Sequence, residues 1–244
     1  MANFFPRWSN WLPLKVAIIV ITLVTGATAA TWYYVTPKYT RVGYEPIQPV
    51  PFSHNVHVEQ LGMDCRYCHS FVDVAAHSNL PNTQTCMACH TQVQKENPKL
   101  EPLRASWKTG APVQWVQIHR SPDYVFYNHA AHVNRGISCH SCHGQVNEMD
   151  VVRHDKPHSM AWCLDCHRDP ENHLRPVEQV FNLNWSPNDV NPAEFVAKYG
   201  MPREAQEAGE DWSKKQKLTQ QEIGRTLKER WNVQPPLNCQ GCHR

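Results

Sequence analysis

One five-residue pattern, Cys-x-x-Cys-His, accounts for every cysteine in the 244-residue chain and limits what the chain can fold into. It occurs at residues 65–69, 86–90, 139–143, 163–167 and 239–243. Two cysteines three residues apart lie on one face of a helical turn, where their sulfurs can form thioethers with the two vinyl groups of a haem, and the next residue turns its imidazole onto the iron. The pattern therefore predicts five covalently attached haem c groups.

The site residues expected from this pattern fall into two groups. The cysteines expected to hold haem covalently are Cys65, Cys68, Cys86, Cys89, Cys139, Cys142, Cys163, Cys166, Cys239 and Cys242. The histidines expected on the proximal side of the iron are His69, His90, His143, His167 and His243. Zinc sites and disulfides are the alternative uses of paired cysteines, but neither requires a histidine at the next position in all five cases.

Five large apolar porphyrins would supply much of the buried apolar surface that a chain otherwise provides from its own side chains. Hydrophobic residues make up 41% of the chain and 19 residues are proline, so the chain is expected to wrap haems instead of building a conventional core. We expect a mainly α-helical and irregular fold with short helices at the motifs and little or no sheet. The formal net charge of +2 gives no strong positive field, so nucleic acid is not an expected partner.

The N-terminal segment is apolar enough to enter a membrane. Residues 16–35 carry no charge, which is long enough for a helix to span a bilayer. We therefore expect a membrane anchor over residues 1–40, with a transmembrane helix at about residues 14–35. The alternative is a signal peptide cleaved after residues 27–29, Ala-Thr-Ala; the apolar run continues past that point and favours an uncleaved anchor.

Charges on either side of this segment bear on its orientation. Arg7 and Lys15 precede it, which predicts a cytoplasmic N-terminus and a haem-carrying body on the periplasmic face, while Lys38 and Arg41 on the other side weaken that prediction. Export agrees with the haem chemistry, because c-type haem is attached on the outer face of the cytoplasmic membrane. We expect a single-pass protein of the bacterial cytoplasmic membrane.

The sequence His-x-x-His-Val occurs twice, each time shortly before a haem motif. It spans residues 54–58 and 129–133, and a second motif follows each first one at a similar interval. The pattern predicts two copies of a two-haem module over residues 41–176. Residues three apart on a helix can reach two different haems, so the distal iron ligands are expected to include His54, His57, His129 and His132. The alternative is that these are solvent-facing histidines on two helices, which does not explain why the same pattern occurs twice.

Five haems need a further distal ligand, and three residues are considered for it. His119 is the first choice, followed by Met149 and Met160, whose thioethers would raise the reduction potential of a haem. Filling space against a porphyrin is the alternative role for each methionine. The other histidines are expected at the surface or beside haem propionates; they are His77, His140, His154, His158 and His173.

Residues 177–244 are expected to form a helical extension that carries the fifth haem. Asn191 followed by proline predicts a helix start, and Gly200 predicts its end. Residues 219–222, Thr-Gln-Gln-Glu, form a capping box for a second helix, with Ile223, Leu227 and Trp231 on one face.

The segments at residues 51–70, 86–90 and 119–171 resemble the pentahaem cytochrome c subunit of alternative complex III, a bacterial membrane quinol:acceptor oxidoreductase. The resemblance extends from about Pro51 to Pro176. It implies that integral membrane subunits oxidise the quinol, and that an iron-sulfur protein subunit and a monohaem cytochrome c accompany this chain. The same family motif contains positions matched by the distal-ligand residues named above, without choosing among them.

Three classes of function are compared. An electron-transfer subunit that relays electrons from quinol oxidation to a cytochrome c or terminal oxidase is favoured, with no catalytic residues of its own. A stand-alone membrane-anchored quinol dehydrogenase of the NapC/NrfH type would need its own quinol pocket, and no residue cluster indicates one. A catalytic multihaem reductase would need an open iron position, yet every motif ends in histidine and ten further histidines are present.

Overall fold

The computed structural model describes residues 6–35 and 40–243. Lys38, which enters the orientation argument, lies outside the described residues. The chain divides into two compact units, residues 1–43 and residues 44–244. Within the described ranges the fold contains helices and irregular segments without a strand; one isolated bridge joins Ile137 to Leu174. The mainly helical and irregular fold expected from the sequence is confirmed.

The helices are short apart from the first. The α-helices are α1 (Leu12–Val35), α2 (Cys65–Cys68), α3 (Thr83–His90), α4 (Glu101–Thr109), α5 (His129–Val133), α6 (Cys139–His143), α7 (Met160–Arg168), α8 (Pro192–Tyr199), α9 (Arg203–Glu207), α10 (Gln220–Arg230) and α11 (Cys239–Cys242). A π-helix, η2, spans Asn55–Gln60. The 3₁₀ helices are η1 (Arg7–Trp11), η3 (Pro98–Leu100), η4 (Val146–Glu148), η5 (Pro170–Asn172), η6 (Val177–Gln179), η7 (Pro187–Asp189) and η8 (Trp212–Lys214).

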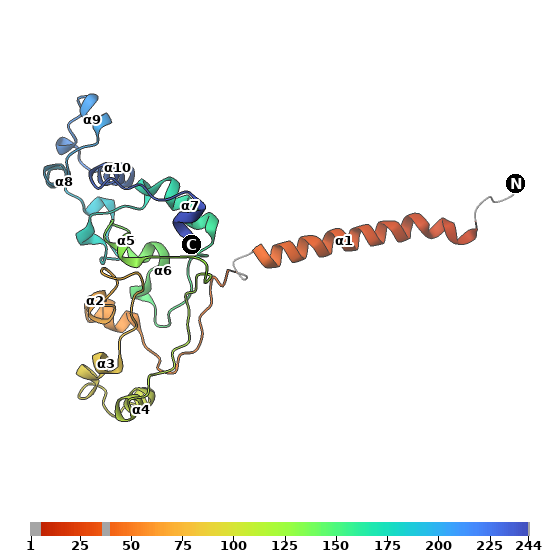
Figure 1. Ribbon diagram of the computed structural model, residues 1–244, viewed down its shortest axis with the longest axis horizontal. Coiled ribbons are helices and arrows are strands. Elements are labelled where there is room, and N and C mark those ends of the chain that lie inside the picture. Colours follow the sequence, from red (N-terminus) through yellow and green to blue (C-terminus); the bar gives the residue numbers. More distant parts are fainter. Residues whose placement is uncertain (1–5, 36–39, 244) are drawn as a thin grey trace. The chain divides into compact units, whose positions relative to one another are not determined.

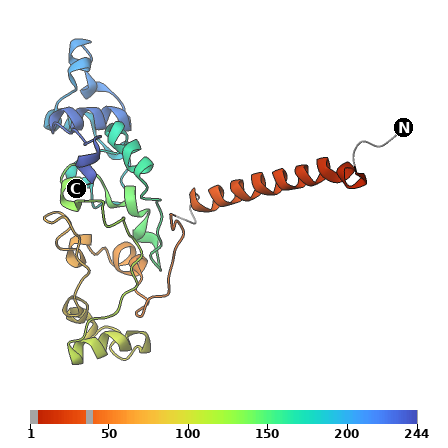
Figure 2. The same ribbon diagram turned by 45° about the vertical axis from the view of Figure 1, so that its right-hand side comes forward.

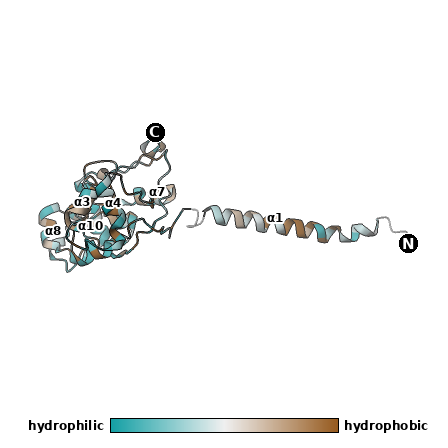
Figure 3. Cartoon of the chain, turned by 90° about the horizontal axis from the view of Figure 1, so that it is seen from below, coloured by the Kyte–Doolittle hydropathy of each residue, from teal (hydrophilic) through white to brown (hydrophobic). Residues whose placement is uncertain are grey.

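Helix α1 forms almost all of the described part of the first unit. Its 24 residues extend about 36 Å at 1.5 Å per residue, and Figure 3 colours much of it as hydrophobic. The stretch Trp8–Tyr34 is long and apolar enough to cross a membrane and is not buried against other protein. A signal sequence near an N-terminus can have the same length and composition.

The second unit carries α2–α11 in an extended arrangement (Figures 1 and 2). Helices α3 and α4 lie at one end, α8, α9 and α10 lie at the other, and α2, α5, α6 and α7 lie between them (Figure 1). All five cysteine motifs form short helices: α2, α3, α6, α7 and α11. Asp64, Asn82, Ser159 and Asn238 cap four of them by accepting a backbone N–H from the first turn.

Small hydrophobic clusters hold this unit together instead of one continuous core. Val50, Met87 and Leu103 are buried together beside α3 and α4. Val72 and Val133 meet Val180 in a second cluster, which joins the segment after α2 to α5 and to the end of η6. Such separate clusters are what we expect of a chain whose large apolar groups are prosthetic.

The conventional core lies in the C-terminal extension, where α8 and α10 pack together. Its buried residues are Leu174, Trp185, Phe195, Ala205, Trp212, Leu218, Ile223 and Leu227. The helix predicted after Asn191 is confirmed as α8, which ends at the Gly200 cap. The capping box predicted at residues 219–222 is confirmed at the start of α10, with Thr219 and Glu222 capping each other's backbone. Ile223 and Leu227 are fully buried, as expected for its apolar face.

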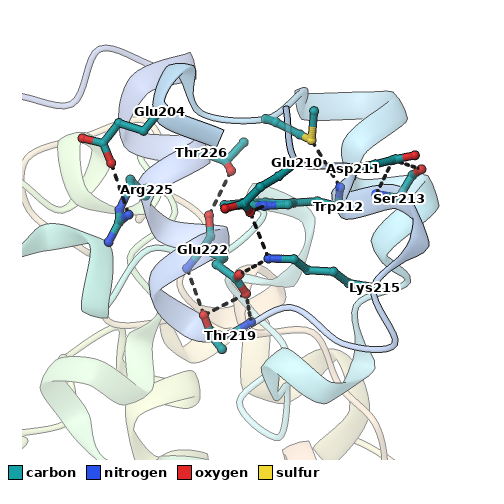
Figure 4. Close-up of polar contacts among 11 residues, drawn as sticks. Glu204, Glu210, Asp211, Trp212, Ser213, Lys215, Thr219, Glu222, Arg225 and Thr226 are labelled. Carbon is teal, nitrogen blue, oxygen red and sulfur yellow. Dashed lines mark hydrogen bonds and ion pairs between the residues drawn. The ribbon is translucent and has the colours of Figure 1, made fainter. Parts of the chain in front are cut away.

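Polar contacts fasten the loop between α9 and α10 to this core (Figure 4). The Lys215 ammonium lies 2.6 Å from a Glu222 carboxylate oxygen and 3.4 Å from a Glu210 carboxylate oxygen. The same Glu210 accepts a hydrogen bond from the Trp212 indole. Helix α10 rests on η5, the turn directly after α7, and Lys228 of α10 pairs with Glu171 of η5 at 2.8 Å. The extension therefore packs against the segment that follows the fourth motif.

Candidate functional site

The histidine that ends each cysteine motif is oriented by a hydrogen bond at its Nδ1. In four of the five motifs Nδ1–H donates to a backbone carbonyl: His69 to Asn79 at 2.8 Å, His90 to Val93 at 2.9 Å, His167 to Pro236 at 2.9 Å and His243 to Tyr124 at 3.1 Å. Such a bond fixes the tautomer and leaves Nε2 unprotonated, which is the form that binds a metal. Nε2 of these four side chains is therefore available to bind an iron.

The third motif differs from the other four. Nδ1 of His143 faces Nε2 of His119 at 3.2 Å, and the two rings are perpendicular with their centres 4.3 Å apart. This separation is too short for an iron to lie between the two rings, so in this geometry His119 contacts the side of His143 that points away from the iron position. The role of His119 as a distal ligand stays a prediction.

The two His-x-x-His segments have the same local geometry. The second histidine of each pair donates Nδ1–H to the carbonyl four residues earlier, from His57 to Ser53 and from His132 to Asn128, both at 2.8 Å. An aromatic residue two positions before the first histidine stacks on the second one. The ring centres are 4.4 Å apart for Phe52 and His57, and 4.5 Å for Tyr127 and His132.

Each of these second histidines faces the terminal histidine of a motif in its own half of the unit. The ring centres of His57 and His90 are 6.2 Å apart, and those of His132 and His167 are also 6.2 Å apart. Two imidazoles bound through Nε2 to opposite faces of one iron, at about 2.0 Å each, have ring centres roughly 6 Å apart. The residues therefore fit a haem iron held between two histidines in the second and fourth motifs.

The first histidines of the two segments, His54 and His129, are half-buried. Burial, with the neighbouring His69 and then His57 acting in the same direction, lowers the pKa of His54 to about 4. Burial also lowers the pKa of His129, whose Nδ1 bonds the Ala76 carbonyl at 3.0 Å. Both imidazoles are therefore neutral at physiological pH, as an iron ligand must be.

His154 and His158 join His119 beside the third motif. The ring centre of His158 lies 6.2 Å from that of His143, but Nε2 of His158 bonds the Cys142 carbonyl at 3.0 Å. His154 lies between His119 and His158, with ring centres 5.2 Å and 4.7 Å away. His154 was expected at the surface or beside a haem propionate; its side chain is 2% exposed, which excludes the surface and leaves the propionate side as a prediction. Because His119 lies 35 positions before His154 in the sequence, the sequence alone does not indicate that these rings meet.

The two methionines considered as ligands differ in burial. Met149 is 3% exposed and its carbonyl accepts the backbone N–H of Asn55, so it packs beside the first His-x-x-His segment. Met160 begins α7 and is 67% exposed. Both remain predictions as ligands.

Arg175 belongs to this region and was not singled out from the sequence. It is 4% exposed, lies over the Trp185 ring and approaches Nδ1 of His140 in the third motif at 3.0 Å. Burial lowers the pKa of its guanidinium, and nearby Cys139 opposes that shift. Arg175 is an isolated arginine in a segment without hydrophobic periodicity, so the sequence does not indicate that it is buried beside the third motif.

The alternative uses of the cysteines find no support in the geometry. All ten cysteines lie within the described residues and none forms a disulfide. Across residues 6–35 and 40–243, no three His, Cys, Asp or Glu side chains gather as a direct metal site would require. The fit to haem instead comes from paired imidazoles on opposite sides of an iron position.

Comparisons with known proteins agree with this geometry. Residues 50–106 match the family model of cytochrome c7 and related cytochrome c. The chain is also 34% identical over 148 residues to the menaquinone reductase multihaem cytochrome c subunit of Nitratidesulfovibrio vulgaris, a match that covers 52% of this chain and 70% of the relative. The chain belongs to the multihaem cytochromes c. Its biochemical role is therefore electron transfer through covalently bound haem c.

The family match places the cytochrome's first His-x-x-His segment and first two motifs within one conserved type of module. Residues 50–106 include His54, His57 and both motif helices α2 and α3. The repeat at residues 127–168 reproduces the same stacking and the same histidine spacing outside the matched range.

Proposed function

We propose that this cytochrome carries five haem c groups and relays electrons for a quinol-oxidising membrane complex of the alternative complex III type. The observation that carries the proposal is the repeated 6.2 Å separation of two imidazoles, His57 with His90 and His132 with His167. An iron held by two histidines has no open position for a substrate, so such a haem exchanges electrons and does not bind or transform a molecule.

The proposed ligand set assigns a role to each group of residues. Ten cysteines hold the porphyrins and the terminal histidine of each motif is the proximal ligand. His57 serves the second motif and His132 the fourth. His54 and His129, which lie near His69, serve the first and third motifs as a pair. The distal ligand of the fifth haem is one of His119, Met149 and Met160.

Bound haem supplies a one-electron iron centre. The chain's own residues do the rest: carbonyl groups fix the Nδ1 atoms of the ligands, and half-buried aromatic rings cover one face of the imidazoles. Phe52 and Tyr127 act in this way, since each stacks on a second-position histidine. Burial raises the reduction potential of a haem relative to exposure to water, and ligand identity tunes it further.

The partners of this cytochrome are proposed from its resemblance to the pentahaem subunit of alternative complex III. The partners are an iron-sulfur protein subunit, polytopic quinol-oxidising membrane subunits and a monohaem cytochrome c. Helix α1 is the proposed anchor in the lipid bilayer, with the N-terminus in the cytoplasm and the haem-carrying body on the periplasmic face of a bacterial membrane. The length and apolar composition of Trp8–Tyr34 support the anchor.

A second candidate reverses the direction of electron flow. The relative in Nitratidesulfovibrio vulgaris is a subunit of a menaquinone reductase, so this cytochrome would deliver electrons toward a quinone instead of receiving them. The ligand set and the haem count are the same in both candidates.

The two candidates are separated by isolating the native assembly in mild detergent, identifying its subunits by mass spectrometry and reducing it with a menaquinol. Recovery with a large iron-sulfur protein and polytopic subunits, with rapid haem reduction by the menaquinol, supports the quinol-oxidising relay. Slow reduction by the quinol, together with rapid quinone reduction by the reduced assembly, supports the reverse direction. Recovery of the chain alone, reduced by quinol, contradicts both and supports a stand-alone dehydrogenase.

A further inference from the structure

The second cysteine motif is joined to the first through η2. His57, on this helix, faces His90 of the second motif. His54, three residues earlier, lies near His69 of the first motif. One short segment thus brings one imidazole close to each of two motifs, which places these two haem sites side by side. Helix α3 of the second motif lies at the end of the unit and α2 of the first motif lies nearer its middle (Figure 1).

The first motif is joined to the third, not only to the second. The Cys65 and Cys139 side chains lie close enough to interact, so the first cysteines of these two motifs are neighbours. The surrounding segments are fastened as well: the Asn134 amide donates to the Asp73 carbonyl at 2.8 Å. Val72, Val133 and Val180 form a buried apolar cluster between the same two segments.

The third motif is joined to the fourth by His158. His158 bonds the Cys142 carbonyl of α6 and packs on Trp162 of α7, with ring centres 5.3 Å apart. His158 therefore contacts both motif helices and holds them next to each other.

The fourth motif is joined to the fifth by the segment that leads into α11. The carbonyl of Pro236, three residues before Cys239, receives Nδ1–H of His167 at 2.9 Å. Cys163 of α7 and Cys242 of α11 are close enough for their side chains to interact electrostatically. The fifth motif thus comes after the fourth in space as well as in sequence.

We propose that the five haems follow one another in space in the order 2–1–3–4–5, with the haems of the second and fifth motifs at the two ends of the wire. The inference rests on the proposed five-haem relay and deepens it, because it states where electrons enter and leave. Sequence order would place the first haem at an end. In the proposed order the first and third haems form the centre, where the two modules meet at Cys65 and Cys139.

The direct test is an electron cryo-microscopy map of the haem-loaded full chain in detergent, with each iron assigned to its motif. The order predicts successive nearest neighbours 2–1, 1–3, 3–4 and 4–5, with one neighbour for each end iron. A map in which the second iron adjoins the third or fourth, or in which the fifth adjoins the first, overturns the order. Five haems in another order would leave the electron relay intact, whereas fewer than five would contradict the proposed function itself.

A solution test uses a nitroxide on one introduced cysteine, which is the only reactive thiol when the native ten are thioethers. The labelled sites are Gln92→Cys after the second motif and Gln234→Cys before Pro236; both residues are exposed. His57→Ala should change the spin-relaxation rate of the label at 92 and leave that at 234 unaltered. His132→Ala should change the relaxation rate of the label at 234 and leave that at 92 unaltered. Each variant is therefore the control for the other. A label at 92 that responds to His132→Ala overturns the order.

Discussion

Gly224 is the point where helix α10 touches the turn after the fourth motif. A Cβ added there would lie 1.8 Å from the Glu171 carbonyl oxygen and 2.5 Å from its carbon. Both are backbone atoms, so no side-chain rotation relieves the contact and α10 must move by more than 1 Å. Overpacking of this kind costs about 3 kcal/mol, and the better helix propensity of alanine returns about 1 kcal/mol. We expect Gly224→Ala to destabilise the extension by about 2 kcal/mol.

Thermal unfolding of the haem-loaded chain, followed by circular dichroism, measures this effect. A loss of about 2 kcal/mol corresponds to a fall in Tm of roughly 4–8 °C for a domain of this size. Gly26→Ala is the matched control, since Gly26 is also helical and an added Cβ there meets nothing within 4 Å. A Gly224→Ala protein as stable as the Gly26→Ala protein would refute the packing argument and the role of α10 as a support for the fourth motif.

Three further predictions follow from named contacts. His57→Ala should remove one iron ligand and produce a high-spin signal in the electron paramagnetic resonance spectrum, whereas the exposed His77→Ala should not; an all-low-spin His57→Ala spectrum would remove His57 from the ligand set. Val180→Ala, at a fully buried position, should lower the free energy of unfolding by about 2 kcal/mol in urea titrations, and an unchanged midpoint would show that the joint between the modules is not tightly packed. Burial alone would raise the pKa of Glu222, but hydrogen bonds from Lys215 and Thr219 outweigh it and hold the pKa below its ordinary 4.5. Its contribution to stability is therefore present above about pH 4.5 and is lost as the pH falls through the lower folded value, so wild type should lose more stability than Glu222→Gln between about pH 5 and pH 3; equal losses would contradict the pairing.

Local signals in the sequence were sufficient for the local structure. The capping residues Asn191 and Thr219 predicted the starts of α8 and α10, because a side-chain oxygen and the first-turn N–H groups are only two or three residues apart. The helical form of each cysteine motif follows from its own spacing. The repeated histidine pairs also indicated a repeated module, and the stacking of Phe52 and Tyr127 on equivalent histidines agrees with that repeat.

Contacts between distant segments could not be read from the sequence. The meeting of Cys65 with Cys139 and of His167 with Pro236 joins residues about seventy positions apart, and nothing local encodes such pairs. The sequence left His154 either at the surface or beside a haem propionate, and only the packing around the third motif shows that it is buried. Which histidine faces which motif depends on this long-range packing and therefore required the structure.

The measurement that tests the central claim most directly is the intact mass of the purified chain after denaturation in a thiol-alkylating reagent. The account predicts the mass of the polypeptide plus five haems and no alkyl groups, because all ten cysteines are held in thioethers. A mass with fewer haems, or with alkyl groups on any of the ten cysteines, would contradict the five-haem wire.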